Sequence, residues 1–397
     1  MTISHNGNGR YRTRRSRSQD SPVRVGVIGC GYWGPQLLRN FQEIPEATLT
    51  AVAEPREDRL AYVRQRYPGV ALFADYRALL ETNVEAVVIA TPIHTHFAIA
   101  RDALIAGKHI LVEKPLTASV QDAVRLNALA AATGVTLMAG HTFLYNPAVQ
   151  ALRDIVQSGE LGRIYYVDSA RLGLGLFQRT VNVIWDLAPH DLSILAYLLG
   201  RNPVAVSARG NSCVQPTVHD VAYIEVQYEG GVSAQIHVSW LDPAKVRRIT
   251  VVGDRKMAVY NDVALAEKIR IYDKGVEPPA TDTFGEFQLS YRNGQVTIPF
   301  IPWQEPLKIE CEHFVQCIRT GATPITDGYQ GLAVVAALEA ANLSLRSEGI
   351  RVAVNVPLHR SIGRDAIAPE TVDATALEEL IPIADEPLEP QPQPASS

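Results

Sequence analysis

The sequence lacks several features that would place it in a specialised class of protein. No apolar run approaches the length of about 20 residues that a helix needs to cross a bilayer, and no signal-type apolar segment stands near the N-terminus. The 397 residues include only four cysteines, which are scattered and form no CxxC pair. We therefore expect reduced thiols, a cytoplasmic location, and neither a disulfide framework nor a metal site.

An excess of charge of one sign is also missing. The net charge is −5, with 20% charged and 47% apolar residues, which is the composition of an ordinary soluble globular protein. This balance gives no reason to expect nucleic acid or a membrane as a partner. The chain is long enough for two domains with substantial cores, and it contains no internal repeat.

The two ends of the chain differ in composition from the rest. Residues 1–21 gather five arginines among Ser, Asn and Gly, and residues 359–397 are rich in Pro, Glu and Asp, with no Lys or Arg after Arg364. We expect a disordered basic arm and a solvated, Pro-rich acidic tail. The Arg- and Ser-rich arm also leaves a transit peptide open.

A glycine turn between a strand and a helix is the first pattern that points to function. Val23–Ile28 is a β-branched run typical of a buried strand. Gly29-x-Gly31-x-x-Gly34 follows, and apolar residues then recur at helical spacing as far as Phe41. This order predicts a dinucleotide site, because the glycines allow a tight turn and let the backbone approach a pyrophosphate at the helix N-terminus.

The surroundings of the turn sharpen this prediction. Glu54 ends the strand predicted over residues 48–53 and stands 20 residues after Gly34, where the motif needs an acid for the ribose hydroxyls. A carboxylate there repels a 2′-phosphate, so NAD is favoured, although Arg56 keeps NADP possible. Tyr32 and Trp33 lie between the glycines and are predicted to flank the cofactor.

Strand and helix patterns alternate as far as residue 140. Continuous apolar strands over residues 86–90, 109–112 and 135–139, with helices between them, predict a parallel sheet covered on both faces. We assign residues 22–142 to a Rossmann domain of the α/β class. Ligands of such a sheet bind outside the carboxyl ends of its strands. The residues predicted at those ends are Glu54, Thr91, Pro92, Glu113, Lys114, Pro115 and His141.

The pattern changes past residue 145. Residues 232–241 alternate between apolar and polar, as in an antiparallel sheet with one polar face. Other strands are predicted over residues 165–171, 204–208, 221–228, 247–253 and 256–260, with helices over 307–320 and 329–347. We assign residues 143–358 to a C-terminal α/β domain with a large, mostly antiparallel open sheet, which binds substrate and forms oligomers.

Lys114 is the first candidate for chemistry. It follows the strand over residues 109–112 and would lie near a nicotinamide ring. Pro115 fixes the backbone beside it, and a cis peptide bond is possible at this position.

Asp186 and His190 form the second candidate site. They stand four residues apart on a helix predicted to run to Leu199, and Pro189 fits only the start of a helix. The carboxylate can orient the imidazole as a base. A metal would need a third ligand, and none stands at a fitting spacing. Asp191 is expected to be an exposed acid in the first turn.

Further polar residues are predicted around the cleft. His96 either approaches the cofactor or holds the start of a helix. Arg171 and Arg179 are candidate anchors for a substrate phosphate or carboxylate. The remaining predicted substrate contacts are His141, Tyr145 and Asn182.

Together these motifs resemble the glucose–fructose oxidoreductase / inositol dehydrogenase family over residues 23–355. The resemblance rests on the glycine turn, Thr91-Pro92 with His96, Glu113-Lys114-Pro115 and Asp186-x-x-x-His190, all in the family's order. It implies a Rossmann domain and a second domain whose open sheet commonly forms the interface of a homodimer or homotetramer. It also implies catalytic roles for Lys114, Asp186 and His190.

Within the family, residues 185–191 and 239–243 look most like the subgroup that oxidises nucleotide-linked amino sugars of the UDP-N-acetylglucosamine type at C3. In the implied reaction, a sugar secondary alcohol loses a hydride to NAD and a proton to His190, oriented by Asp186, while Lys114 holds the oxygen; Lys114 and His190 can exchange roles. The alternatives are a myo-inositol or free-sugar dehydrogenase and a non-catalytic sensor, which would not need these three side chains.

Overall fold

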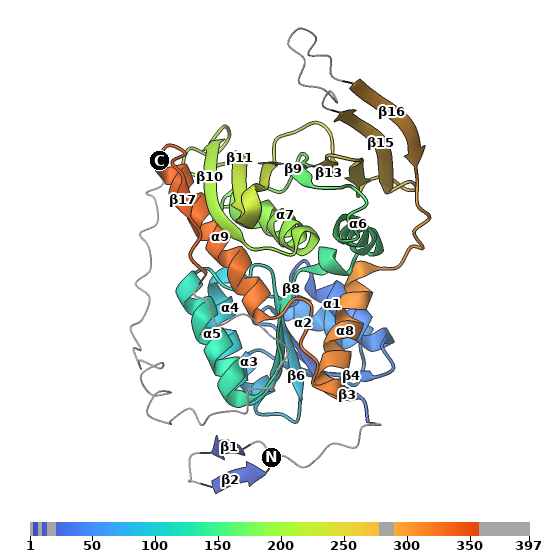
Figure 1. The fold of residues 1–397 in the computed structure, drawn as a ribbon. Coiled ribbons are helices and arrows are strands. Elements are labelled where there is room, and N and C mark those ends of the chain that lie inside the picture. Colours follow the sequence, from blue (N-terminus) through green and yellow to red (C-terminus); the bar gives the residue numbers. More distant parts are fainter. Residues whose placement is uncertain (1–2, 7–9, 14–20, 278–289, 357–397) are drawn as a thin grey trace. The chain divides into compact units, whose positions relative to one another are not determined.

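The computed structural model describes residues 3–6, 10–13, 21–277 and 290–356 (Figure 1). Strands β1 (Ile3–Asn6) and β2 (Arg10–Thr13) pair antiparallel within the predicted basic arm. The predicted acidic tail lies outside the described residues. None of the helices in the described ranges has the length and apolarity needed to cross a membrane.

The first domain is a six-stranded parallel sheet in the order β5-β4-β3-β6-β7-β8. This is the doubly wound Rossmann order, with its switch point between β3 and β6. The predicted parallel sheet is therefore confirmed, and only the three-residue strand β5 has no counterpart in the prediction. The strands are β3 (Val23–Ile28), β4 (Ala47–Ala53), β5 (Ala71–Phe73), β6 (Ala86–Ile89), β7 (His109–Glu113) and β8 (Leu137–Gly140).

Helices cover both faces of this sheet because its strands are apolar on both sides. Val25, Val27 and Val88 are fully buried. The two ends of α5 show how the sequence sets the boundaries of a helix. At the N-terminus, the Ser119 side chain accepts a hydrogen bond from the N–H of Asp122, and at the C-terminus Gly134 ends the helix in a left-handed conformation. The helices are α1 (Gly34–Glu43), α2 (Glu57–Arg66), α3 (Tyr76–Leu80), α4 (Ile93–Ile105) and α5 (Val120–Thr133).

The second sheet has nine strands in the order β16-β15-β14-β13-β9-β12-β11-β10-β17. Only β12 and β9 pair in parallel, so the predicted, mostly antiparallel sheet is confirmed. The short 3-10 turn η2 (Glu229–Gly231) joins β11 to β12, as the two glycines predicted. The strands are β9 (Ile164–Leu172), β10 (Pro203–Asn211), β11 (Val221–Tyr228), β12 (Ser233–Ser239), β13 (Val246–Gly253), β14 (Met257–Asn261), β15 (Ile269–Glu277), β16 (Ser290–Thr297) and β17 (Val352–Ala353).

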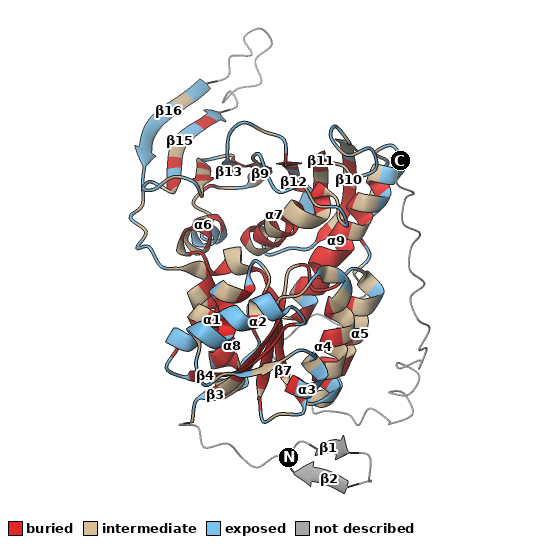
Figure 2. Ribbon diagram, turned by 180° about the vertical axis from the view of Figure 1, so that it is seen from behind, coloured by how far each residue is buried: buried red, intermediate tan, exposed pale blue. Residues whose placement is uncertain are grey.

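One face of the second sheet is packed and the other is partly open (Figure 2). The inward residues of β12, such as Ile236 and Val238, are buried against α7 (Val183–Leu199), whereas Gln235 is exposed. The helix α6 (Pro147–Gln157), preceded by η1 (Thr142–Tyr145), packs beside α7, and α9 (Gly328–Arg346) packs against both β10 and α5. The long helix α9 thus joins the two domains.

Helix α8 (Pro306–Thr320) belongs to the first core. Its residues Leu307, Cys311 and Phe314 are buried with Phe41 of α1. The sequence placed this helix in the second domain, but its apolar face fits the groove beside α1. The chain therefore crosses from β16 back to the first domain, and residues 298–305 run between them.

Candidate active site

The glycine turn has the geometry that a dinucleotide needs. Gly29 has φ +96°, and a Cβ there would lie 2.7 Å from the carbonyl oxygen of Ala90. A Cβ at Gly34 would lie 2.6 Å from the carbonyl oxygen of Gly29, whereas a Cβ at Gly31 would meet nothing within 4 Å. The first and third glycines close the turn, and the second leaves open space at the N-terminus of α1. A pyrophosphate fits this space.

Glu54 stands at the carboxyl end of β4, as predicted, and also fixes the turn. Its Oε2 accepts the N–H of Cys30 over 2.7 Å, and its Oε1 accepts both the N–H and the Nε–H of Arg56 over 3.2 Å. A carboxylate has lone pairs left for ribose hydroxyls. Tyr32 and Trp33 are 80% and 44% exposed and meet edge to face, so both aromatic rings border the open side of the turn.

Thr91, Pro92 and His96 follow β6. The His96 ring is buried between the carbonyl oxygens of Thr91, 2.8 Å from Nε2, and Pro115, 2.9 Å from Nδ1. Of the two roles predicted for His96, this geometry supports the structural one, because both ring nitrogens are engaged. The ring ties the end of β6 to the Lys114–Pro115 bond, which is cis.

Lys114 joins the two domains at the centre of the site. Its Nζ donates to the carbonyl oxygen of Asp186 over 2.8 Å and lies 3.5 Å from Oδ1 of the same residue. The second carboxylate oxygen, Oδ2, accepts the indole N–H of Trp240 over 2.9 Å. Asp186 is therefore held by a cation on one side and a fixed donor on the other.

His190 lies at the same cavity but does not bond to Asp186. Its Nδ1 has no hydrogen-bond partner within the described ranges, and its ring packs edge to face on Phe143 at 4.9 Å. The predicted orientation of His190 by Asp186 is thus not what the structure shows, because Lys114 and Trp240 occupy the carboxylate. Burial and the nearby charges of Lys114 and Arg171 lower the pKa of His190 well below its usual value, so the imidazole is neutral.

The helix that carries this pair begins earlier than Pro189 suggested. Asn182 caps α7 by accepting the N–H of Trp185, so Asp186 lies in the first turn and Pro189 falls inside the helix. The proline removes one backbone donor, and the packed surroundings of α7 outweigh that loss. Asn182 also donates to Oδ1 of Asn342 over 2.9 Å, so it has a structural role beside any contact with substrate.

The predicted anchor Arg171 and the predicted surface acid Asp191 are partners in the interior. Nε of Arg171 lies 2.7 Å from Oδ2 of Asp191, and Ser169 donates to Oδ1 over 2.8 Å. Asp191 is only 1% exposed, so its prediction as a surface acid is wrong: as the helix begins at Val183, position 191 faces β9. The guanidinium of Arg171 is bound to Asp191 in the interior, and the side chain of Arg179 is exposed.

His141 and Tyr145 follow β8 but are not among the residues that line the cavity described below. Tyr145 is 1% exposed and its hydroxyl lies 2.9 Å from Oγ1 of Thr326, which makes it a core residue. His141 is fully buried, and burial with the charge of Lys114 lowers its pKa to about 3.

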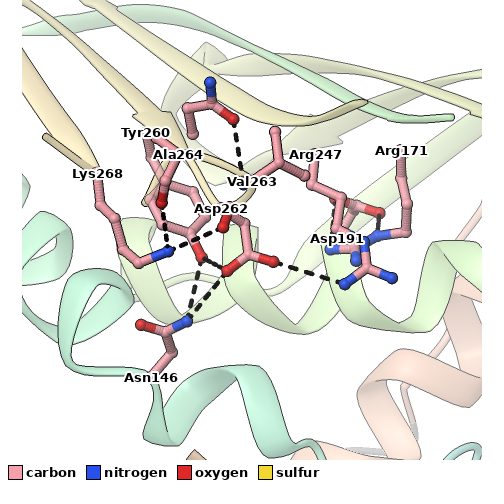
Figure 3. A network of polar contacts seen from close by, with 10 residues as sticks. Asn146, Arg171, Asp191, Arg247, Tyr260, Asp262, Val263, Ala264 and Lys268 are labelled. Atoms are coloured by element: carbon pink, nitrogen blue, oxygen red, sulfur yellow. Dashed lines mark hydrogen bonds and ion pairs between the residues drawn. The ribbon is translucent and has the colours of Figure 1, made fainter. Parts of the chain in front are cut away.

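A cavity of about 870 Å³ lies between the glycine turn and the second sheet. Trp33, Glu113, Lys114 and His190 line its inner part. Figure 3 shows the polar contacts at one wall of this cavity. Asp262 accepts hydrogen bonds from Tyr260 and Asn146 and forms an ion pair with Arg247. The segment 298–307 completes the rim, with Phe300 and Trp303 exposed by 92% and 76%.

Three important side chains have no role in the sequence-based site. Trp240 fixes Asp186, Phe143 packs on His190, and Arg247 faces the cavity. Trp240 stands in the segment 239–243 that carried part of the resemblance, and that was its only signal. Arg247 lies on a strand whose register was needed to show which face it occupies. Among the described residues, no cluster of three or more His, Cys, Asp or Glu could hold a metal.

Comparison with known proteins agrees with this geometry. The family model described as an oxidoreductase family with an NAD-binding Rossmann fold matches residues 23–141, and the GFO/IDH/MocA C-terminal domain matches residues 149–259. The chain therefore has an NAD-binding Rossmann domain.

Relatives of this kind cover most of the chain. Scyllo-inositol 2-dehydrogenase (NAD(+)) of Bacillus subtilis is 26% identical, over 76% of this chain and 88% of its own. UDP-N-acetylglucosamine 3-dehydrogenase of Acidithiobacillus ferrooxidans is 29% identical, over 79% and 95%. A solved structure from Magnetospirillum magnetotacticum is 31% identical, with a TM-score of 0.69 over 81% of this chain and 99% of its own. The chain belongs to the GFO/IDH/MocA family of NAD-dependent oxidoreductases.

Proposed function

We propose that this dehydrogenase oxidises a nucleotide-linked amino sugar of the UDP-N-acetylglucosamine type at C3. The observation that carries the proposal is the composition of the cavity beyond the catalytic residues. From Lys114 and His190 it extends to a guanidinium, Arg247, and to the exposed rings of Phe300 and Trp303. A free polyol has neither an anionic group to bind the guanidinium of Arg247 nor a planar base to stack on the rings of Phe300 and Trp303.

Arg247 can take the anchoring role that was predicted for Arg171. Its side chain is 36% exposed, and its ion pair with Asp262 spans 3.5 Å at Nη1. A guanidinium has five N–H donors in a planar fork that suits phosphate oxygens, so donors remain for a diphosphate. The carboxylate of Asp262, itself held by Tyr260 and Asn146, keeps the arginine in place.

The aromatic rim supplies the second kind of contact. Phe300 and Trp303 stand on the segment between β16 and α8, and both line the cavity. Glu305 ties the end of this segment to α1, because Arg39 forms an ion pair with its carboxylate and Asn40 donates to it. Exposed rings on an anchored segment are suited to stack on a nucleobase.

Within this proposal the chain's own residues divide the chemistry between them. When bound, NAD supplies the acceptor for the hydride; the glycine turn holds its pyrophosphate and Glu54 its ribose. Lys114, positioned by Asp186, donates to the substrate oxygen and stabilises the negative charge that develops there. His190, a neutral imidazole, takes the hydroxyl proton.

We also propose that the open face of the second sheet joins copies of the chain into a homodimer or homotetramer. Tyr166 and Tyr223 are 47% and 54% exposed there, and Tyr223 stacks on His237 at 4.3 Å. Light scattering of the wild type and of Tyr223→Glu tests this assembly.

The four cysteines are unpaired, which supports the cytoplasm as the location.

The substrate is tested with purified protein, NAD and two alcohols, UDP-N-acetylglucosamine and myo-inositol, by following the absorbance of reduced nicotinamide. We expect turnover of the nucleotide sugar, and a rise in its KM of about tenfold or more in Arg247→Gln, the value of a charged hydrogen bond. Arg248→Gln is the matched control, since its side chain is exposed on the next position of β13.

The competing result is turnover of myo-inositol alone. The resemblance to scyllo-inositol 2-dehydrogenase is the observation that favours this alternative. It would retain the catalytic residues and overturn the proposed substrate. Absence of turnover with both alcohols, with NAD bound, would direct the search to other sugars before a sensor role is considered.

A further inference from the structure

A second carboxyl group besides that of Asp186, that of Glu113, lies next to Lys114, and the carboxyl group of Glu310 lies close to Glu113. Glu113 lines the cavity, and its Oε2 accepts the N–H of Lys114 over 3.3 Å. Glu310, on α8, is fully buried, and its Oε2 accepts the hydroxyl of Thr142 over 2.7 Å. Gly140 makes room for the first of them, because a Cβ there would lie 3.3 Å from Oε2 of Glu113. The end of β8 and the segment that follows it thus contact both acids.

Buried polar atoms without a protein partner gather around the same segment. Within the described ranges these are both ring nitrogens of His141, Nδ1 of His190 and Oε1 of Glu310. His141 stands between Gly140 and Thr142 in the chain, and Phe143, the next residue, packs on His190. Buried polar groups that lack protein partners bind ordered water. These atoms therefore mark the positions at which ordered water would join the reacting end of the cavity to the two acids.

The charges around the acids favour one shared proton. The groups that interact with them are Lys114, which follows β7, Thr142 and Tyr145 of η1, and Cys311 on α8. Burial raises the pKa of Glu113 to about 7, although Lys114 opposes the shift. Burial and the charge of Glu113 raise the pKa of Glu310 well above its usual value. Two carboxyl groups that share one buried site do not both ionise near neutral pH, because the two negative charges would repel each other.

Oxidation of the alcohol releases a proton that must leave this site. The C–H bond gives its electron pair and hydrogen to the nicotinamide as a hydride, and the O–H electron pair becomes the second bond of the C=O group. The hydroxyl proton passes to His190. Its buried imidazole does not favour the charged form, so each turnover requires a further acceptor nearby.

We propose that Glu113 is this acceptor and that Glu310 is the positioning residue behind it. The proton leaves His190 through the bridging water, protonates the Glu113 carboxylate and is then lost to solvent from the cavity. Glu310 stays protonated, so it neither repels the ionised Glu113 nor competes for the proton. The inference rests on oxidation of an alcohol by this chain and is independent of which sugar is the substrate.

The test is the pH dependence of kcat for oxidation in four proteins: wild type, Glu113→Gln, Glu310→Gln and Glu312→Gln. In the wild type we expect kcat to fall as the pH drops below about 7, where Glu113 becomes protonated. In Glu113→Gln we expect kcat to lose this pH dependence and to be about 10- to 100-fold lower than in the wild type, at the lower end of proton-transfer effects. Glu310→Gln keeps the fall near pH 7, because a neutral amide replaces a carboxyl group that stays protonated. Glu312, exposed on the same helix, is the control without effect.

A second measurement needs neither cofactor nor substrate. Infrared titration of the free protein should show a carboxyl group that ionises near pH 7 in the wild type and that is missing in Glu113→Gln, with thermal melting used to verify folding. A wild-type pH profile retained by Glu113→Gln, or the same carboxyl signal in that variant, would overturn the proposal. Absence of turnover in the wild type, with its carboxyl signal near pH 7 present, would instead count against the proposed substrate.

Discussion

Nζ of Lys114 lies 2.8 Å from the backbone carbonyl oxygen of Asp186 and 3.5 Å from its Oδ1. This contact joins the residue that follows β7 of the Rossmann domain to the first turn of α7 in the second domain. It places the ammonium group over the inner part of the cavity without removing all of its donors, since an ammonium has three. The two domains thus share the side chain that we propose to hold the substrate oxygen.

Replacement of this lysine should separate catalysis from binding. We expect Lys114→Met to lower kcat by about 10²- to 10⁴-fold, the range for loss of a positioned proton-transfer or oxyanion group, while the Kd for NAD changes little. Steady-state kinetics and NAD titration measure the two effects. Lys108→Met is the control at the other end of the same strand, where Nζ bonds to the carbonyl oxygens of Thr82 and Val84. Equal losses in both variants would contradict the assignment.

The glycine turn allows binding and folding to be distinguished. Because a Cβ at Gly31 meets no protein atom within 4 Å, we expect Gly31→Ala to keep the melting temperature and to weaken NAD binding by about tenfold or more, by blocking the approach of the pyrophosphate. Gly29→Ala should lose both, because its φ is +96° and its Cβ would meet the backbone of Ala90.

Gly69 provides the matched control for these variants. It has the same φ of +96°, but a Cβ there meets nothing within 4 Å. Gly69→Ala therefore isolates the cost of backbone strain, about 1–3 kcal/mol, and should leave NAD binding unchanged. Calorimetry of all three variants, with and without NAD, measures the contributions. Normal NAD affinity in Gly31→Ala would show that the cofactor does not use this turn.

The elements of the fold were predictable to the extent that local pattern determines them. The apolar run at Val23–Ile28 and the alternation over residues 232–241 identified the right kind of sheet, because burial on one or two faces leaves a direct mark on the sequence. The position of α8 was not predictable in this way. Its apolar stripe fits either domain, and only packing against Phe41 decides between them.

The site shows the same limit at the level of single side chains. Lys114, Asp186 and His190 were identified by spacing and strand position, and the structure brings all three to one cavity or its edge. The roles of Arg171 and Arg247 were not, because both are arginines on strands of the second sheet. Register pairs Arg171 with Arg247 across β9 and β13, and the acid beside each differs: Asp191 of α7 for the first and Asp262 after β14 for the second. These contacts join residues far apart in the sequence.

The buried pair of Arg171 and Asp191 should be visible in stability. Removing one partner leaves an unpaired buried charge, so Arg171→Met should lower the free energy of unfolding by about 3–5 kcal/mol. Glu57→Gln, in the exposed pair with Arg64, should change it by less than about 1 kcal/mol. Urea unfolding measures both. The double variant Arg171→Met with Asp191→Leu should regain part of the loss, because no charge is then left unpaired.

Trp240 offers the most direct test of how Asp186 is held. Its side chain is 1% exposed, and its indole N–H donates to Oδ2 of Asp186 over 2.9 Å. Trp240→Phe keeps an aromatic ring but removes the donor, so the carboxylate is held by Lys114 alone. We expect kcat to fall by about tenfold, since a hydrogen bond to a charged group is worth about 1.5–3 kcal/mol. The KM for NAD should not change, because the contact lies away from the glycine turn. Tyr62→Phe, at an exposed position of α2, serves as the control. A kcat that is unchanged in Trp240→Phe would mean that Lys114 alone fixes Asp186, and that the indole serves only to pack the core beneath α7.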